Sequence, residues 1–187
     1  MNFLGHALLA GGGNDEVLLG ALIADGIKGS PSDALPADVR YGIVHHRQVD
    51  AAIDAHPETR ALLACMPMRR FAGIALDMFW DHCLSCQYLQ TGDATTQAIV
   101  ERCYKVVRAY PLPPTRECML LEMADQRWLE RYAELAFTCS AIRGLGQRLR
   151  RPQQLNPIGE WLNHHQRSLQ NVFFGRLWPD LRAEFAL

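Results

Sequence analysis

A histidine and two acidic residues recur at four-residue spacing in a segment that ends at a proline. His46, Asp50 and Asp54 would therefore share one face of a helix. An imidazole combined with carboxylate oxygens is a ligand set suited to Mn²⁺, Fe²⁺, Zn²⁺ or Mg²⁺. Taken alone, the same residues could equally form a solvated polar face with pairs inside the helix.

A second acidic pair, Asp77 and Asp81, has the same spacing inside the most apolar helical segment of the chain. Like charges one turn apart repel each other, and buried carboxylates are costly unless a partner or a cation compensates them. A divalent cation would remove the conflict, and arginines such as Arg47 or Arg70 are the alternative partners. His82 points about 100° away from Asp81 and need not share the site. The two segments together predict a metal site between helices.

Two single residues join these segments as candidates. Asp25 lies at an expected helix C-terminus, where the helix dipole disfavours a carboxylate, so we expect a compensating role, with Lys28 as the alternative partner. His6 lies among apolar residues, where a lone histidine is more often a core residue than a ligand. His45 is expected at the surface or behind the site.

Composition indicates one folded domain. The chain has 187 residues, of which 49% are hydrophobic, and a net charge of −1. No apolar run approaches the roughly 20 residues that span a bilayer, and the first residues do not resemble a signal peptide. We therefore expect a cytoplasmic protein without membrane insertion. Of the six cysteines only Cys83 and Cys86 are close in sequence, and buried reduced thiols are expected rather than disulfides or a zinc site.

Proline and glycine separate long helical patterns, and no alternating strand pattern is present. The sequence predicts an all-α, single-domain helical bundle over residues 1–187. The expected helices run from Asn14 to near Gly26, from Pro36 to Pro57, from there to Pro67, from Arg69 to about Tyr88, and over about 93–109, 115–124, 126–138, 139–150, 155–173 and 179–185. The helix that begins at Arg69 is apolar on every side and is expected to be central.

The charge is unevenly distributed along the chain. The first half is acidic, which suits a cation site, and the second half is basic. A stretch between residues 140 and 152 contains no acid and four arginines, which suit an anionic partner or a solvated helix end: Arg143, Arg148, Arg150 and Arg151. Aromatic residues and arginines are not interleaved, so nucleic-acid binding is disfavoured. The serine-hydrolase and phosphate-loop motifs are absent.

At these residues the chain resembles the acyl carrier protein phosphodiesterase family. The specific motifs lie in the first 85 residues, and weaker similarity continues to the C-terminal segment. The specific motifs are Met1-Asn2-Phe3-Leu4-x-His6, Asp25 with Lys28-Gly29, His46-Arg47-x-x-Asp50-x-x-x-Asp54-x-His56-Pro57, Arg69-Arg70 and Leu76-Asp77-x-x-Trp80-Asp81-His82. The weaker ones are Trp128-Leu129-x-x-Tyr132, Arg148-x-x-Arg151-Pro152 and Phe173-Phe174-x-x-x-Trp178-Pro179.

The resemblance implies an all-helical fold distantly like the HD-domain metal-dependent phosphohydrolases. It also implies a Mn²⁺-dependent hydrolysis that releases 4′-phosphopantetheine from a serine of holo acyl carrier protein and leaves the apo form. With the residue chemistry, it suggests a metal set drawn from His6, Asp25, Asp77 and Asp81, and a catalytic set of His46, Arg47, Asp50, Arg69 and Arg70. In that hypothesis His46 or Asp50 orients water, His46 is the alternative imidazole ligand, and the arginines neutralise phosphoryl charge.

Three positions depart from the family pattern. Leu8 stands where a second histidine is frequent, Gly26 where an aromatic residue is common, and Cys83 where an aromatic residue is usual. Loss of the histidine matters only if that histidine is a ligand. The departures bear on the breadth of substrates more than on the class of reaction.

The resemblance also names a partner. Acyl carrier proteins are acidic, so the arginine-rich stretch around residues 143–151 is expected to receive one. Two alternatives stay open: an HD-like phosphohydrolase that acts on a nucleotide or another small phosphoester, and a non-catalytic helical module whose buried acids are held by arginines.

Overall fold

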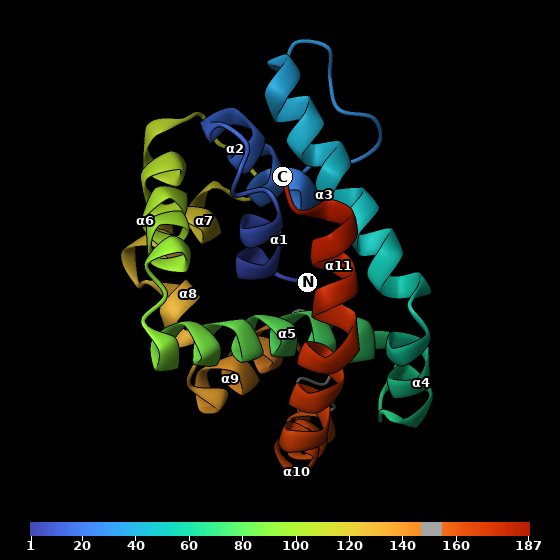
Figure 1. The fold of residues 1–187 in the computed structure, drawn as a ribbon. Helices are drawn as coiled ribbons and strands as arrows, with labels where there is room; N and C mark the ends of the chain where they lie inside the picture. The colour runs from blue at the N-terminus through green and yellow to red at the C-terminus, as the bar shows by residue number, and fades with distance from the viewer. Residues whose placement is uncertain (147–154) are drawn as a thin grey trace.

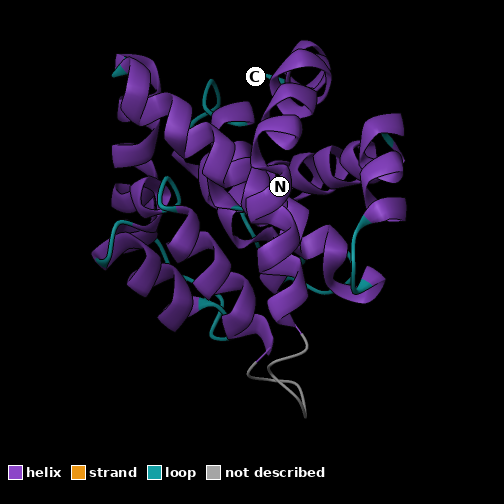
Figure 2. Cartoon of the chain, turned by 90° about the horizontal axis from the view of Figure 1, so that it is seen from below, coloured by secondary structure: helices purple, strands orange, loops and turns teal. Residues whose placement is uncertain are grey.

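The regular structure of the chain is helical throughout the residues that the computed structural model describes, which are 1–146 and 155–187 (Figure 2). The predicted all-α class is confirmed. The α-helices, labelled in Figure 1, are α1 (Phe3–Leu9), α2 (Asp15–Ile23), α3 (Ala37–Ala55), α4 (Pro57–Cys65), α5 (Arg69–Thr91), α6 (Ala94–Ala109), α7 (Glu117–Asp125), α8 (Trp128–Arg131), α9 (Leu135–Gly146), α10 (Asn156–Val172) and α11 (Trp178–Phe185). A short 3₁₀ helix (Ala24–Gly26) follows α2, and a π-helical turn (Phe173–Leu177) joins α10 to α11.

Most helix boundaries follow the capping and proline signals of the sequence. The Asn14 side chain accepts a hydrogen bond from the backbone N–H of Val17 at 3.0 Å and so begins α2. The predicted continuous helix over 126–138 is wrong. Arg127 has a left-handed backbone (φ 52°), so α8 begins only after it and is a single turn. A turn then separates α8 from α9, which begins at Leu135 rather than at 139.

Helix α5 is central, as predicted. Its Phe79 and Trp80 are fully buried, and the Trp80 ring stacks on Phe173 with 4.9 Å between ring centroids. This stack joins α5 to the C-terminal part of the chain, of which α11 crosses in front of α5 and α10 lies below it in Figure 1. Among the described residues, no helix combines the length and the apolar character that crossing a membrane requires.

Helix α1 was not predicted, because seven residues give too little periodicity. It packs against α2, α5, α6 and α11, which surround it in Figure 1. Its first N–H groups point at α5. The carboxylate of Asp81 accepts the N–H of Leu4 at 2.7 Å and that of Gly5 at 3.0 Å. A carboxylate from another helix therefore caps the start of α1, where the helix dipole favours negative charge.

Helices α2 and α3 approach each other closely at two glycines. A Cβ atom added at Gly20 would overlap the backbone of Val39 and Gly42, and one added at Gly42 would overlap the Val17 carbonyl. Because neither residue has a side chain, the two backbones can touch. This contact determines how closely α3, and the polar face that it carries, packs against α2.

The cysteines are unpaired, as expected, although they are not all buried. Cys83 and Cys103 lie in the core, whereas Cys65 and Cys118 are exposed. The expectation of uniformly buried thiols is wrong for these two, which occupy the solvent sides of α4 and α7.

Candidate metal centre

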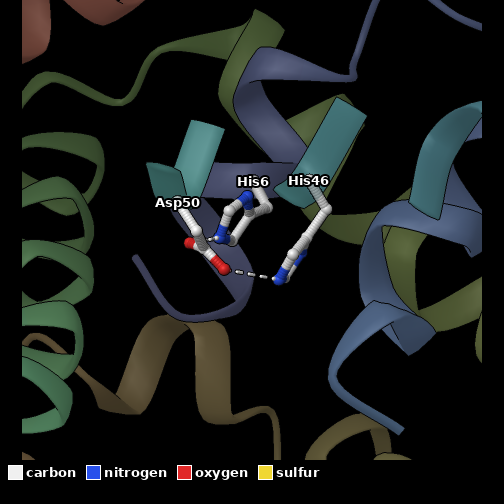
Figure 3. A group of neighbouring side chains, drawn as sticks. All are labelled: His6, His46 and Asp50. Atoms are coloured by element: carbon white, nitrogen blue, oxygen red, sulfur yellow. Dashed lines mark ion pairs between the residues drawn. The ribbon is translucent and has the colours of Figure 1, made fainter. Parts of the chain in front are cut away.

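His6, His46 and Asp50 converge at one point between α1 and α3 (Figure 3). The Asp50 carboxylate lies 3.0 Å from Nε2 of His6 and 3.1 Å from Nε2 of His46. The two imidazole rings stack, with 3.6 Å between their centroids. One ligand atom from each residue lies within 4.8 Å of the others. The four-residue spacing of His46 and Asp50 thus does place both on one face of α3.

The close α2–α3 contact orients His46. Nδ1 of His46 lies 2.8 Å from the backbone carbonyl of Ala21, the residue after Gly20, and donates a proton to it. The other nitrogen, Nε2, therefore faces Asp50. A ligating histidine is commonly held in this way, with one ring nitrogen bonded to a carbonyl and the other left for the metal.

Burial and charge set different protonation states for the two histidines. Burial lowers the pKa of His6 to about 3, so this ring is neutral. Burial also acts to lower the pKa of His46, but hydrogen bonds to the carboxylates of Asp25 and Asp50 outweigh it and raise that pKa to about 9. For Asp50, burial is outweighed by hydrogen bonds from His46 and His6, which hold its pKa well below the usual range.

Two further carboxylates border this group. Asp25 lies 3.4 Å from Nε2 of His46 and accepts a 2.7 Å hydrogen bond from the Arg116 guanidinium. Asp77 lies on the other side, where the Met1 amino group bridges it to Asp50 at 3.0 and 3.4 Å. Burial raises the pKa of Asp77, whereas the hydrogen bond with His46 lowers that of Asp25. The three carboxylates form an acidic cluster that suits a cation.

The cluster opens into a cavity of about 540 Å³. One part of its wall is polar, with Asp25, Asp50, Asp77 and Arg116, and another part is apolar. The apolar and aromatic residues come from α5, α7, α8 and the N-terminal segment: Met1, Phe3, Ile74, Met78, Met119, Trp128 and Tyr132. A charged centre at one side of an apolar cavity suits a ligand that has both characters.

The donor set fits a divalent metal ion. Two imidazoles and a carboxylate are ligands that Mn²⁺, Fe²⁺ and Zn²⁺ accept. Nδ1 of His6 is buried and has no hydrogen-bond partner, which is unusual for a buried polar atom. The polar contacts of the His6 ring are thus made by Nε2 alone, to Asp50 and to the Met1 carbonyl at 2.9 Å.

Asp81 lies outside this group, although the sequence pointed to it as a ligand. It is fully buried, and both of its oxygens accept backbone N–H groups of α1. Burial raises its pKa to about 6 despite these bonds. The buried Asp81 carboxylate, for which the sequence suggested a cation or an arginine, is therefore stabilised by the N–H groups at the start of α1.

The three predicted site arginines also lie away from the cluster. Arg47 donates to the carbonyls of Gly29 and Ile27 at 2.7 and 2.6 Å and so ties the loop after α2 to α3. Arg69 and Arg70 are exposed and line a second cavity of about 420 Å³ with Arg60. Ile74 lines both cavities, so this surface adjoins the candidate site.

The remaining predicted residues fall in several places. Asp54 is exposed at the end of α3. Arg143 is exposed on α9, while Arg148, Arg150 and Arg151 lie outside the described residues. His45 is buried, with Nε2 2.8 Å from the Phe185 carbonyl, so of its two expected positions, at the surface or behind the site, the surface one is wrong. It takes no part in the His6–His46–Asp50 group.

Sequence reasoning missed two residues that line the cavity. Arg116 precedes α7 in a proline-rich connection, where no helical period marks it. Tyr132 follows α8, and its hydroxyl accepts a hydrogen bond from the side-chain amide of Asn2 at 2.8 Å. In the sequence, Tyr132 stands out only as the end of the weaker motif Trp128-Leu129-x-x-Tyr132. A basic residue directly before a helix gives no signal of its own.

Known proteins are similar to this chain over its full length. A family model described as acyl carrier protein phosphodiesterase matches residues 1–181. The chain belongs to the acyl carrier protein phosphodiesterase family. Relatives with that name from Salmonella agona, Salmonella dublin and Salmonella newport are each 34% identical over 191 residues, which cover 100% of this chain and 98% of the relative. No solved structure matched the chain.

The structure places the three residues that depart from the family pattern, Leu8, Gly26 and Cys83. Leu8 faces a separate cavity of about 380 Å³ between α1, α5, α6 and α11, away from the cluster. Cys83 is buried in α5. Gly26 lies against Arg116, which lines the cavity beside the acidic cluster. Of the three departures, Gly26 is therefore the one next to the candidate site.

Proposed function

We propose that this chain is a metal-dependent phosphodiesterase that hydrolyses the bond between 4′-phosphopantetheine and a serine of holo acyl carrier protein. The products are the apo carrier protein and 4′-phosphopantetheine. The observation that carries the proposal is the convergence of His6, His46 and Asp50 beside a cavity with a polar and an apolar wall. Family membership supplies the class of substrate.

His6, His46 and Asp50 would hold the metal, which we propose to be Mn²⁺, and Asp25 and Asp77 border it. A bound divalent cation would polarise a phosphoryl oxygen and lower the pKa of a water molecule. The carbonyl of Ala21 keeps the His46 ring oriented, and Asp50 holds both imidazoles at fixed separation. A carboxylate at this position can also orient the attacking water by accepting a hydrogen bond from it.

The apolar wall suits the pantetheine arm. Met78, Met119 and Trp128 offer flexible and aromatic surface to a thin, weakly polar chain. Confining the arm there would exclude water from the phosphoryl group, except for the molecule that attacks it. We further propose that the carrier protein docks on exposed arginines near the cavity mouth, among them Arg69, Arg70 and Arg143.

The decisive experiment uses metal-stripped protein and holo acyl carrier protein, with and without Mn²⁺, and weighs the carrier protein by mass spectrometry. We expect a metal-dependent loss of about 340 Da, the mass of the phosphopantetheine group, because hydrolysis needs the cation. Asp50→Asn should abolish the loss. Arg108→Ala, which removes an exposed ion pair with Asp125, is the matched control and should retain it.

An unchanged carrier protein under all metal conditions would overturn the proposal. Cleavage of free nucleotides or small phosphoesters by the same preparation would then assign the site to that class. Turnover by Asp50→Asn equal to wild type would mean that the His6–His46–Asp50 group is not the catalytic centre.

A further inference from the structure

Arg116 lines the cavity beside Asp25, and its N–H donors are incompletely used. One terminal nitrogen pairs with Asp25 at 2.7 Å, and the other contacts only the sulfur of Met119 at 3.7 Å. Its Nε is buried and has no partner. A guanidinium presents five N–H donors in a planar fork, so N–H donors on its two terminal nitrogens remain beyond the pair with Asp25.

The carboxylates of the cavity already have cationic partners, because the Met1 amino group pairs with Asp50 and Asp77 and the His46 ring contacts Asp25 and Asp50. The described lining of the cavity includes three carboxylates, and among the lining side chains that the structure describes Arg116 is the one with permanent positive charge. A phosphodiester carries one negative charge over two oxygens that do not bridge its esters. A planar fork matches two such oxygens better than an ammonium does.

Gly26 leaves the space that Arg116 occupies. A Cβ atom added at Gly26 would lie 2.5 Å from Cγ of Arg116, well inside van der Waals contact. Because Cγ lies near the start of the arginine side chain, it cannot move aside without turning the whole guanidinium. The absence of a side chain at position 26 therefore allows the fork to reach the cavity.

We propose that Arg116 binds the non-bridging phosphoryl oxygens of the substrate and that Gly26 is the residue that admits it. The identity of that substrate rests on the proposed function, whereas the anion site itself does not. Arg116 contacts the anion from the side of α7, and Asp25 holds the guanidinium in place.

Variants of Arg116 test the contact. With holo acyl carrier protein, Arg116→Ala should lower kcat/KM by about 100-fold, since it removes charge-assisted hydrogen bonds to phosphate. Arg116→Lys should lower it by about 10-fold, because the ammonium keeps the charge and the pair with Asp25 but loses the fork. Arg108→Ala is the control and should stay within about twofold. Full activity of Arg116→Lys would reduce Arg116 to a partner of Asp25 and overturn the proposal.

A double-mutant cycle tests Gly26. Gly26→Ala should reproduce most of the loss seen with Arg116→Ala, because the new Cβ displaces the arginine. In the Arg116→Ala background the same substitution should cost almost nothing, so the two effects should not add. Additive effects would show that Gly26 acts independently of Arg116.

Equilibrium binding of inorganic phosphate, measured by calorimetry on the Mn²⁺-loaded protein, separates this inference from the proposed function. Arg116→Ala should weaken phosphate binding about 10-fold relative to Arg108→Ala, at equal metal content. If Arg116→Ala weakens phosphate binding but the wild-type protein does not cleave holo carrier protein, the anion site is supported and the proposed substrate is refuted. If the wild-type protein cleaves holo carrier protein but Arg116→Ala binds phosphate as tightly as wild type does, the substrate is supported and the anion site is refuted.

Discussion

At the scale of single residues, Asp81 joins two distant parts of the chain through its carboxylate. The four-residue spacing from Asp77 rightly marked it as a buried acid in need of compensation. Both of its oxygens accept backbone N–H groups of α1, from Leu4 and Gly5. A backbone donor leaves no trace in side-chain patterns, so the sequence could indicate the need but not its source.

Asp81→Ala should therefore destabilise the fold strongly. It would leave two buried N–H groups without acceptors, and each such loss costs about 1–3 kcal/mol, so we expect a loss of about 2–6 kcal/mol in the free energy of unfolding. Urea denaturation measures this value. Asp54→Ala removes an exposed carboxylate and should change it by less than about 0.5 kcal/mol. A comparable value for both variants would contradict the capping role.

At the scale of elements, the α2–α3 contact shows how two glycines position His46, a side chain of the candidate metal centre. Gly20 and Gly42 let the helix backbones touch, and the carbonyl of the next residue, Ala21, then reaches Nδ1 of His46. The spacing of His46 and Asp50 predicted their shared face. How closely that face packs against α2 depends on the backbone contact at Gly20 and Gly42, which the spacing of His46 and Asp50 does not indicate.

Gly42→Ala should separate α2 from α3. We expect a loss of about 1–3 kcal/mol in stability from overpacking, together with weaker Mn²⁺ binding because His46 loses its carbonyl partner. Gly73→Ala is the matched control. It also lies within a helix, its added Cβ would meet no atom within 4 Å, and it should stabilise α5 by about 0.5–1 kcal/mol. Thermal unfolding and metal titration of both variants measure the difference. Equal stability of the two would mean that the helices have room for a methyl group.

At the scale of the whole molecule, the candidate centre joins helices that are far apart in sequence. His6 comes from α1, His46 and Asp50 from α3, and Arg116 from the segment before α7. The sequence supplied His6, His46, Asp50, Asp25 and Asp77, because their types and spacings are unusual in apolar surroundings. It could not supply Arg116, whose role follows from a tertiary contact with Gly26 and Asp25.

A metal held by α1 and α3 should stabilise the folded chain as a whole. At a free Mn²⁺ concentration of 100 times its dissociation constant, the gain is about 2.7 kcal/mol, which corresponds to a rise in Tm of about 5–10 °C. A chelator should reverse the rise in a thermal scan. His46→Ala should lose the response, whereas His164→Ala, an exposed residue of α10, should keep it. An equal rise in both variants would locate the ion elsewhere.

The cap that Asp81 places on α1 also sets an order of events during folding. A seven-residue helix does not persist alone in water, and the acceptor for its first N–H groups lies 77 residues further along the chain for Leu4. Closing so long a loop is slow compared with forming local helices such as α3. His6 is carried by α1, so its imidazole reaches His46 and Asp50 only after α5 has docked. On the proposed function, a chain that is still folding would offer a metal ion only the α3 half of the site, His46 and Asp50, and would acquire its full metal affinity as one of its last steps.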